Sequence, residues 1–145
     1  MIKGVIRKRL NKYNDERGWL SEVWREDELT GYKPVMAYIS ETKPGVARGP
    51  HEHEKQSDCF VFVGPGNFEL HLWDKKGAHE ILSVGQDNPT LIIVPPGVVH
   101  AYKCVSDVAG WVINLPDNLY AGEGKKDDVD EIRWEDNPES PYHII

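Results

Sequence analysis

The sequence has little cysteine and no long apolar run, and each shortage excludes a class of protein. Its two cysteines, Cys59 and Cys104, lie in apolar segments without paired spacing, which indicates reduced, buried thiols rather than a disulfide scaffold. No stretch approaches the roughly 18 apolar residues of a membrane span, and the N-terminal residues do not resemble a signal peptide. We therefore expect a cytoplasmic protein that does not enter a membrane.

Basic residues are also scarce. The 17 Lys and Arg residues are outnumbered by 24 Asp and Glu, so the formal net charge is −7. Nucleic acid is thereby excluded as a default partner, although one or two arginines can still hold a small anionic ligand. The hydrophobic fraction of 39% and the charged fraction of 28% are typical of a globular protein. The length predicts one domain spanning residues 1–145.

Helical periodicity is nearly absent, and only Glu26–Leu29 has the pattern of a turn or two. Short runs rich in Val, Ile and aromatic residues alternate instead with Gly, Pro, Asn and Asp. The predicted strands are Pro34–Thr42, Cys59–Gly64, Phe68–Trp73, His79–Val84, Thr90–Val94 and Gly110–Leu115. Short strands at this spacing indicate an all-β sandwich or barrel.

The segment Asn67–Trp73 alternates between apolar and polar residues. Phe68, Leu70 and Leu72 share one face of an extended strand, and the intervening side chains, beginning with Glu69, share the other. If the first face packs in the core, the second faces either water or the polar interior of a ligand-binding barrel.

Three histidines form the main candidate site. His51 and His53 alternate with Glu52, so both imidazoles point to the same side of an extended segment. His100 follows a turn that Pro95, Pro96 and Gly97 favour, and Asp58 lies five residues after His53. We predict a shared pocket for the histidines. With Asp58 they also have the ligand types of a non-haem metal site, which stays open as an alternative.

Two arginines and a tyrosine complete the candidates. Arg17 and Arg48 each precede a glycine, and arginine is the preferred side chain for bidentate contacts to phosphate or carboxylate. Tyr120 follows the last apolar strand, where a phenol can extend over the mouth of a barrel.

Four motifs in order resemble one family, the dTDP-4-dehydrorhamnose 3,5-epimerase-like cupins. The matches are Asp15–Glu22 (D-x-R-G-x-x-x-E), Arg48–His51 (R-G-x-H), Pro95–Tyr102 (similar to P-x-G-x-A-H-G-F) and Trp134–Asp136 (similar to W-N-D). The segment Tyr38–Lys43 and the pair His51 and His53 are more similar to the related dTDP-4-keto-6-deoxyhexose 3,4-ketoisomerases, which carry H-A-H.

The resemblance implies a cupin jelly-roll homodimer that acts on a nucleotide-diphosphate 4-keto sugar, as in dTDP-rhamnose and polysaccharide biosynthesis. By motif position, His51 would be the general base that removes the proton beside the ketone, and Tyr120 the acid on the opposite face. Arg48 and Arg17 would hold the diphosphate and nucleotide, with Arg17 and Glu22 across the dimer interface. The same resemblance places Glu69 and His100 among the substrate-binding residues.

The sequence departs from the epimerases at two points. Their pocket lysine falls around Ser57–Cys59, where no lysine occurs, and the carboxylate that pairs with their catalytic histidine is expected beyond the reach of this chain. Asp58 or Glu69 is then expected to orient His51, and protonated His53 or His100 to stabilise the enolate.

The expected reaction is metal-independent and needs no cofactor. Two alternatives remain open. One is a metal-dependent cupin dioxygenase or isomerase with a divalent metal on His51, His53, Asp58 and His100. The other is a non-catalytic cupin that binds a sugar.

Overall fold

A computed structural model describes all residues 1–145. The strands are β1 (Ile6–Arg9), β2 (Tyr13–Asp15), β3 (Gly18–Leu20), β4 (Tyr38–Thr42), β5 (Ala47–Glu52), β6 (Asp58–Phe62), β7 (Asn67–Trp73), β8 (His79–Gly85), β9 (Thr90–Val94), β10 (Val99–Cys104), β11 (Gly110–Asn114) and β12 (Ile132–Arg133). The two 3₁₀ turns are η1 (Glu123–Lys125) and η2 (Trp134–Asp136). No helix is both long and apolar enough to cross a membrane.

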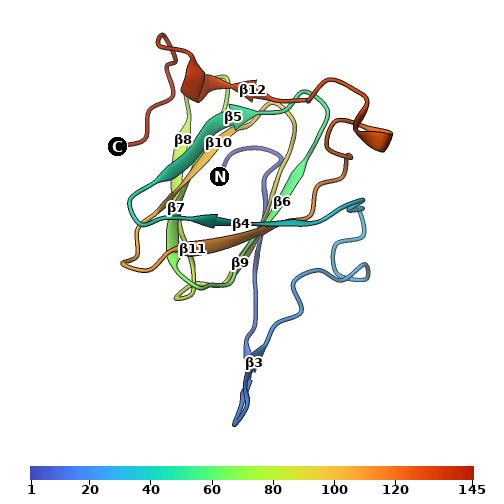
Figure 1. Ribbon diagram of the computed structural model, residues 1–145, viewed down its shortest axis with the longest axis vertical. Coiled ribbons are helices and arrows are strands. Elements are labelled where there is room, and N and C mark those ends of the chain that lie inside the picture. Colours follow the sequence, from blue (N-terminus) through green and yellow to red (C-terminus); the bar gives the residue numbers. More distant parts are fainter.

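Two five-stranded antiparallel sheets face each other and form the barrel (Figure 1). One has the order β1-β9-β6-β11-β4, and the other has the order β12-β5-β10-β7-β8. Strands adjacent in the sequence lie in different sheets at several points, for example β4 and β5, or β9 and β10. The predicted all-β jelly roll is thereby confirmed, and the six predicted strands appear as β4, β6, β7, β8, β9 and β11.

The interior of the barrel is filled by a core of 14 buried residues. Phe68, Leu70 and Leu72 of β7 belong to this core, so the apolar face of the alternating segment points inward. The structure therefore corrects the expected position of Glu69, whose side chain is 41% exposed beside His71 on the outer face of β7. Strand alternation takes Glu69 away from the barrel interior.

Segments outside the strands cover part of the outer face of each sheet. Cys59 and its neighbours on the first sheet pack against residues that precede β4, such as Leu10 and Tyr32. Trp73 and its neighbours on the second sheet pack against the C-terminal segment, which includes Tyr142. Both cysteines are free and buried, as expected from the sequence.

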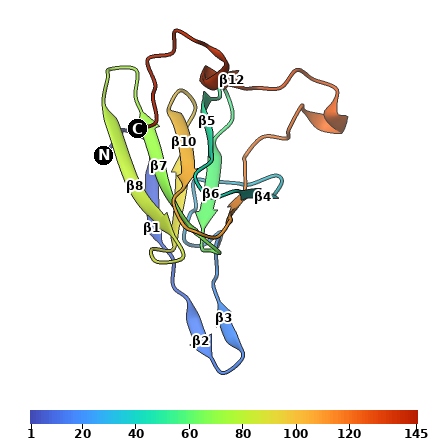
Figure 2. The same ribbon diagram turned by 60° about the vertical axis from the view of Figure 1, so that its left-hand side comes forward.

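Strands β2 and β3 form a hairpin that projects from the body of the molecule (Figure 2). Its side chains are exposed, and they include Tyr13, Trp19 and Leu20. Within this chain the hairpin pairs only with itself.

Candidate functional site

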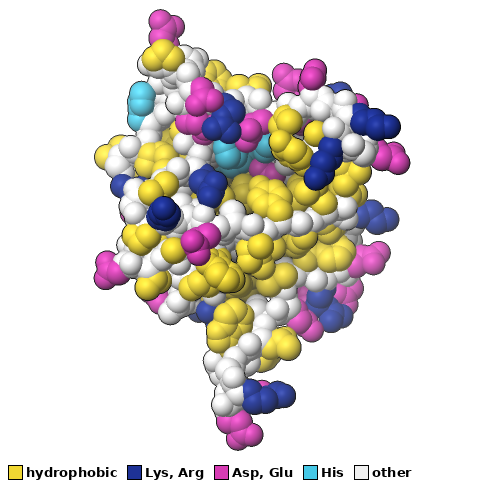
Figure 3. Space-filling view, viewed as in Figure 1, with side chains coloured by type: hydrophobic (Ala, Val, Ile, Leu, Met, Phe, Trp, Pro, Cys, Tyr) yellow, Lys and Arg dark blue, Asp and Glu magenta, His cyan; other side chains and the backbone are white.

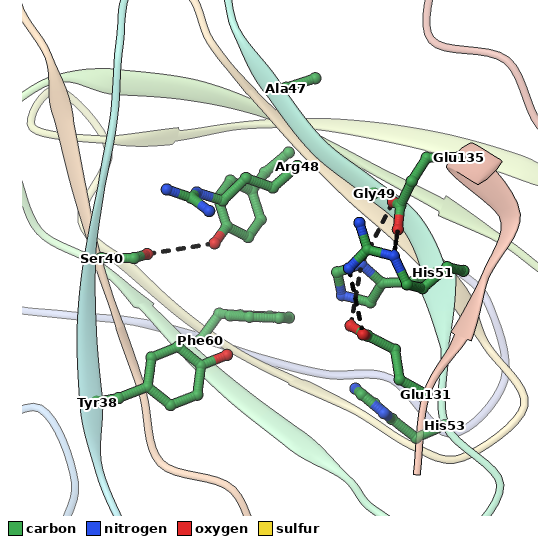
Figure 4. A pocket seen from close by; sticks show the side chains of 12 residues that line it. Tyr38, Ser40, Ala47, Arg48, Gly49, His51, His53, Phe60, Glu131 and Glu135 are labelled. Atoms are coloured by element: carbon green, nitrogen blue, oxygen red, sulfur yellow. Dashed lines mark hydrogen bonds and ion pairs between the residues drawn. The ribbon is translucent and has the colours of Figure 1, made fainter. Parts of the chain in front are cut away.

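A cavity of about 370 Å³ lies between β4, β5, β6, β10 and the C-terminal segment around β12. His51, His53, Arg48 and Tyr38 line it (Figure 4). Figure 3 shows histidine side chains within a hollow on this face, with charged side chains on one side and hydrophobic ones on the other. The structure thus brings together three of the residues predicted from the sequence, namely His51, His53 and Arg48.

Glycine at position 49 allows β5 to approach β10 closely. A Cβ atom there would lie 2.6 Å from the carbonyl oxygen of His100, and the φ angle of Gly49 is +91°. The register between the two strands shifts beside this contact, and His51 pairs directly with His100. The R-G-x-H motif therefore has a structural basis, because only glycine suits this backbone conformation and this spacing.

His51 faces two carboxylates. Its Nδ1 atom lies 3.8 Å from Glu131 Oε1 and 3.8 Å from Glu135 Oε2, and Figure 4 shows both side chains beside the ring. They reach it because β12 pairs with β5, with Arg133 opposite His51. This corrects two expectations: the C-terminal segment does supply carboxylates, and Glu69 does not orient His51. In the sequence, the acidic residues around Trp134 are the feature that indicates these carboxylates.

The electrostatic surroundings of His51 favour its neutral form. Burial lowers the pKa of the imidazole to about 2, and the neighbouring His100 adds to this effect. The rings of His51 and His100 meet edge to face, with centroids 4.6 Å apart.

Behind His51 lies a buried polar group. The Nε2 atoms of His53 and His100 lie 2.9 Å and 3.0 Å from the same oxygen, Oδ2 of Asp58. Burial opposes the charge on Asp58, but the two histidines outweigh it and hold the carboxyl pKa well below its usual value. Burial also opposes protonation of His53, but Asp58 and Asp130 outweigh it and raise the His53 pKa to about 9.

The predicted substrate contact of His100 is corrected by this arrangement. The residue is only 1% exposed and does not line the cavity. His51, His53, Asp58 and His100 nevertheless each offer one ligand atom, and these atoms lie within 4.8 Å of one another. The four residues predicted as an alternative metal site are therefore in one cluster.

Arg48 and two tyrosines form the opposite wall of the cavity. Arg48 Nε donates to Thr42 Oγ1 at 3.0 Å, and Nη2 donates to the carbonyl oxygen of Glu41 at 2.7 Å. Its remaining N–H groups are available to a ligand. Sequence analysis missed Tyr38 and Tyr102 as lining residues, because an isolated tyrosine on a strand is equally common in a core.

Tyr120 lines a second, adjoining cavity of about 1050 Å³ rather than the histidine pocket. The two cavities share Tyr38, His53 and Glu131. Tyr120 is 56% exposed, and its backbone N–H donates to Met36 Sδ at 3.3 Å. The phenol thus lies at the rim of the second cavity, which adjoins the histidine pocket.

The structure does not bring Arg17 and Glu22 to either cavity. Arg17 lies at the turn of the β2–β3 hairpin, where its side chain is 85% exposed and pairs with Asp15. Glu22 pairs with Arg25 and is 50% exposed. Within one chain, neither residue contacts the site.

Comparisons with known sequences place the chain among proteins of polysaccharide biosynthesis. The family model described as polysaccharide biosynthesis C-terminal domain matches residues 13–125. The spore coat polysaccharide biosynthesis protein SpsL of Bacillus subtilis is 33% identical over 142 residues, which cover 94% of this chain and 92% of that protein. The probable low-salt glycan biosynthesis epimerase Agl13 of Haloferax volcanii is 35% identical over 127 residues, which cover 82% of this chain and 78% of that protein.

Solved structures share the fold at lower identity. A dTDP sugar isomerase from Desulfovibrio desulfuricans superimposes with a TM-score of 0.82 at 23% identity, covering 97% of this chain and 90% of that chain. The sugar 3,4-ketoisomerase QdtA from Thermoanaerobacterium thermosaccharolyticum, in complex with TDP, gives a TM-score of 0.72 at 17% identity, with coverages of 92% and 90%. A dTDP-4-dehydrorhamnose 3,5-epimerase from Sulfolobus tokodaii gives 0.74 at 20% identity, with coverages of 90% and 77%.

Proposed function

Because the chain belongs to the polysaccharide biosynthesis family of SpsL and Agl13, and has the fold of the dTDP-sugar epimerases and ketoisomerases, we propose that it is a nucleotide-sugar epimerase or isomerase. Its substrate is a nucleoside-diphosphate 4-keto-6-deoxyhexose, of the kind from which dTDP-rhamnose is made. A nucleotide-activated substrate fits the expected cytoplasmic location.

The observation that carries the proposal is the setting of His51. Its Nδ1 atom faces the carboxylates of Glu131 and Glu135, which favour the tautomer with hydrogen on Nδ1. The Nε2 lone pair is then free to act as a base in a cavity that also contains Arg48. The burial that keeps this imidazole neutral also weakens it as a base, and the two carboxylates offset this by stabilising the imidazolium that forms when His51 takes the proton beside the ketone.

The reaction consists of two proton transfers. His51 removes the proton from the carbon beside the C4 ketone as the C–H electron pair forms an enolate, and Tyr120 then protonates that carbon from the opposite face. His51 and Tyr120 return to their starting states by exchange with water. There is no net oxidation, so this chemistry needs no redox cofactor.

Arg48 supports binding of the diphosphate, since it lines the cavity and only its Nε and Nη2 atoms donate to other residues of the chain. Arg17 and Glu22 bind substrate only if a second copy of the chain brings its hairpin to the site. We therefore propose a homodimer in which the β2–β3 hairpin of each subunit completes the site of the other.

Deuterium incorporation tests the proposed function. The protein is incubated in deuterated water with dTDP-4-keto-6-deoxyglucose, and C3 and C5 are followed by NMR. We expect deuterium at one or both carbons, together with either inversion or migration of the keto group. No uptake and no migration would contradict both epimerase and ketoisomerase activity.

Neutralising the two carboxylates beside His51 is expected to slow turnover. The double substitution Glu131→Gln, Glu135→Gln should reduce kcat by about 10- to 100-fold with a smaller change in KM, because the base loses its tautomer control and the developing imidazolium loses its counter-charges. Each single substitution should have a smaller effect, since both carboxylates face the same nitrogen.

Asp136→Asn is the matched control for this pair. Asp136 lies in the same segment and pairs with Arg133, but its side chain is 66% exposed and does not face His51. Its kcat should stay near that of the wild type. A positioning role is contradicted if the double variant changes KM alone, or if the Glu→Asp pair fails to recover part of the lost kcat.

Mixed subunits test the shared site. Arg17→Ala and His51→Gln homodimers should each be weakly active, but a heterodimer of the two should contain one intact site, composed of His51 from one subunit and Arg17 from the other. After denaturation and co-refolding at equal amounts, about a quarter of the wild-type activity should return, since about half of the dimers are mixed and each has one working site. Activity no higher than the mean of the separate variants would contradict a composite site.

A further inference from the structure

Glu52 lies between the two histidines of the site in sequence, and the proposed proton transfers do not use it. Strand alternation directs its side chain to the face of β5 opposite His51. There the residue is only 5% exposed. Burying a charged carboxylate costs free energy unless close partners compensate for it, so the position of Glu52 needs an explanation.

The carboxylate has two partners, and both approach the same oxygen. Trp134 Nε1 donates a hydrogen bond to Glu52 Oε1 at 3.2 Å, and Lys75 Nζ donates to it at 2.5 Å. The Lys75 ammonium also lies 5.4 Å from the centroid of the Trp134 ring, within the range of a cation–π contact. The three side chains therefore contact one another pairwise, although they come from β5, the β7–β8 turn and η2.

Trp134 connects this group to the cavity, because it directly precedes Glu135. Its ring packs on the outer side of the second sheet beside Tyr142, with ring centroids 5.0 Å apart. Glu135 extends the other way, and Figure 4 shows its carboxylate beside the His51 ring. The position of the indole therefore determines where η2 presents Glu135.

The backbone alone holds this segment by few contacts. Strand β12 has only two residues, both exposed, and it pairs with β5 at the edge of the sheet. Short, exposed edge elements open locally at low free-energy cost. Glu131 and Glu135 lie on either side of β12, so such opening would move both carboxylates away from His51. The hydrogen bond of Trp134 adds a side-chain contact at the point where the strand ends.

We propose that Glu52 is a positioning residue for the catalytic base. Its carboxylate binds the indole of Trp134, and Lys75 supplies the compensating positive charge. Trp134 in turn holds Glu135 beside His51. Without this contact, the carboxylates would face Nδ1 for less of the time, and both tautomers of the neutral imidazole would be populated. The geometric part of the inference concerns the protein alone, whereas its effect on the rate rests on the proposed function.

NMR of the ¹⁵N-labelled protein without substrate tests the geometry. The indole signal of Trp134 is assigned by its loss in Trp134→Phe, and the ring nitrogens of His51 should show hydrogen on Nδ1. In Glu52→Ala we expect the indole signal to shift and the Nδ1–H tautomer of His51 to fall to about half. Glu52→Gln retains an oxygen that accepts from the indole, so both signals should stay close to those of the wild type.

Turnover tests the effect on the base. Glu52→Ala and Trp134→Phe should each reduce kcat for deuterium exchange by about 10-fold and change KM by less than about 3-fold, because misplaced supporting groups slow the chemical step. Glu52→Gln should recover most of this loss. In protein that already carries Glu131→Gln and Glu135→Gln, Glu52→Ala should reduce kcat by less than about 2-fold further, since the carboxylates that it positions are absent.

Trp111→Phe is the matched control. Trp111 Nε1 also donates to a glutamate carboxylate, Glu41 Oε2 at 3.0 Å, but this pair lies on the other sheet. Its loss should leave kcat and the His51 tautomer unchanged. Circular dichroism is recorded for every variant, so that loss of folding is not taken for loss of positioning. Trp134→Phe retains an aromatic ring and keeps the test open if Glu52→Ala does not fold.

Three outcomes would overturn the inference. The first is an unchanged tautomer and kcat in folded Glu52→Ala or Trp134→Phe, with normal exchange by the wild type, which would leave the proposed function standing. The second is a loss of kcat that Glu52→Gln does not recover. The third is a full 10-fold effect of Glu52→Ala in the protein that lacks both carboxylates.

Failure of the proposed function gives a different result. If the wild type shows no exchange on the 4-keto sugar, but the His51 tautomer and the Trp134 indole signal change in Glu52→Ala and not in Glu52→Gln, the positioning contact stands and the proposed function is refuted.

Discussion

His51→Gln is expected to reduce deuterium incorporation into the 4-keto sugar by about 10³-fold, within the usual range for loss of a general base. Glutamine is polar and of similar size, but its amide cannot accept a proton near neutral pH. The measurement is the initial rate of deuterium uptake at C3 and C5 by NMR, at saturating substrate.

Two comparisons make this result specific. His143→Gln changes an exposed histidine and should retain the wild-type rate. Substrate affinity of His51→Gln, measured without turnover by calorimetry, should change by less than about 10-fold, because Arg48 remains in place. Near-normal exchange in folded His51→Gln would show that another group removes the proton.

Tyr120→Phe is expected to separate proton removal from inversion. The variant retains His51, so deuterium should still enter the carbon beside the ketone at a rate within about 3-fold of the wild type. Inversion at that carbon should fall by about 10²-fold, because the opposite face lacks its acid. Both quantities are obtained from one NMR time course.

Tyr38→Phe is the decisive comparison for Tyr120. Tyr38 lines both cavities, and its hydroxyl oxygen accepts a hydrogen bond from Asn114 at 2.9 Å. Burial raises the pKa of Tyr38 to about 12, so its phenol carries its proton at neutral pH. Inversion lost in Tyr38→Phe and kept in Tyr120→Phe would assign the acid to Tyr38 instead.

The strands could be predicted because their side chains alternate or are uniformly apolar. Thr90–Val94 was predicted with the bounds that the structure shows, since it is buried throughout and bounded by turn residues. The segment Ala47–Glu52 was not among the predicted strands, although His51 was expected on an extended segment, because Gly49 and Pro50 have low strand propensity. It forms β5 through pairing with β10 and β12, which propensity does not reveal.

The site was predictable where its members share a local pattern. His51 and His53 lie two residues apart, so strand geometry brings them together without knowledge of the fold. Glu131 and Glu135 were missed because they reach His51 only through the pairing of β12 with β5, about 80 residues away in sequence. Glu69 was misplaced for a similar reason: the sequence shows two faces of β7 but not which one lines the barrel.

The apolar core residues and the polar residues of the site occupy different segments of the same strands. Strand β6 begins with Asp58 in the polar cluster and continues with Phe60 and Phe62 in the core, and β10 passes from His100 to Tyr102 in the same way. Changes at the polar end therefore leave most of the contacts that stabilise the fold intact. Such a barrel can evolve a new base, a new acid or a new electrophile without losing its structure, which is how one architecture comes to host different reactions.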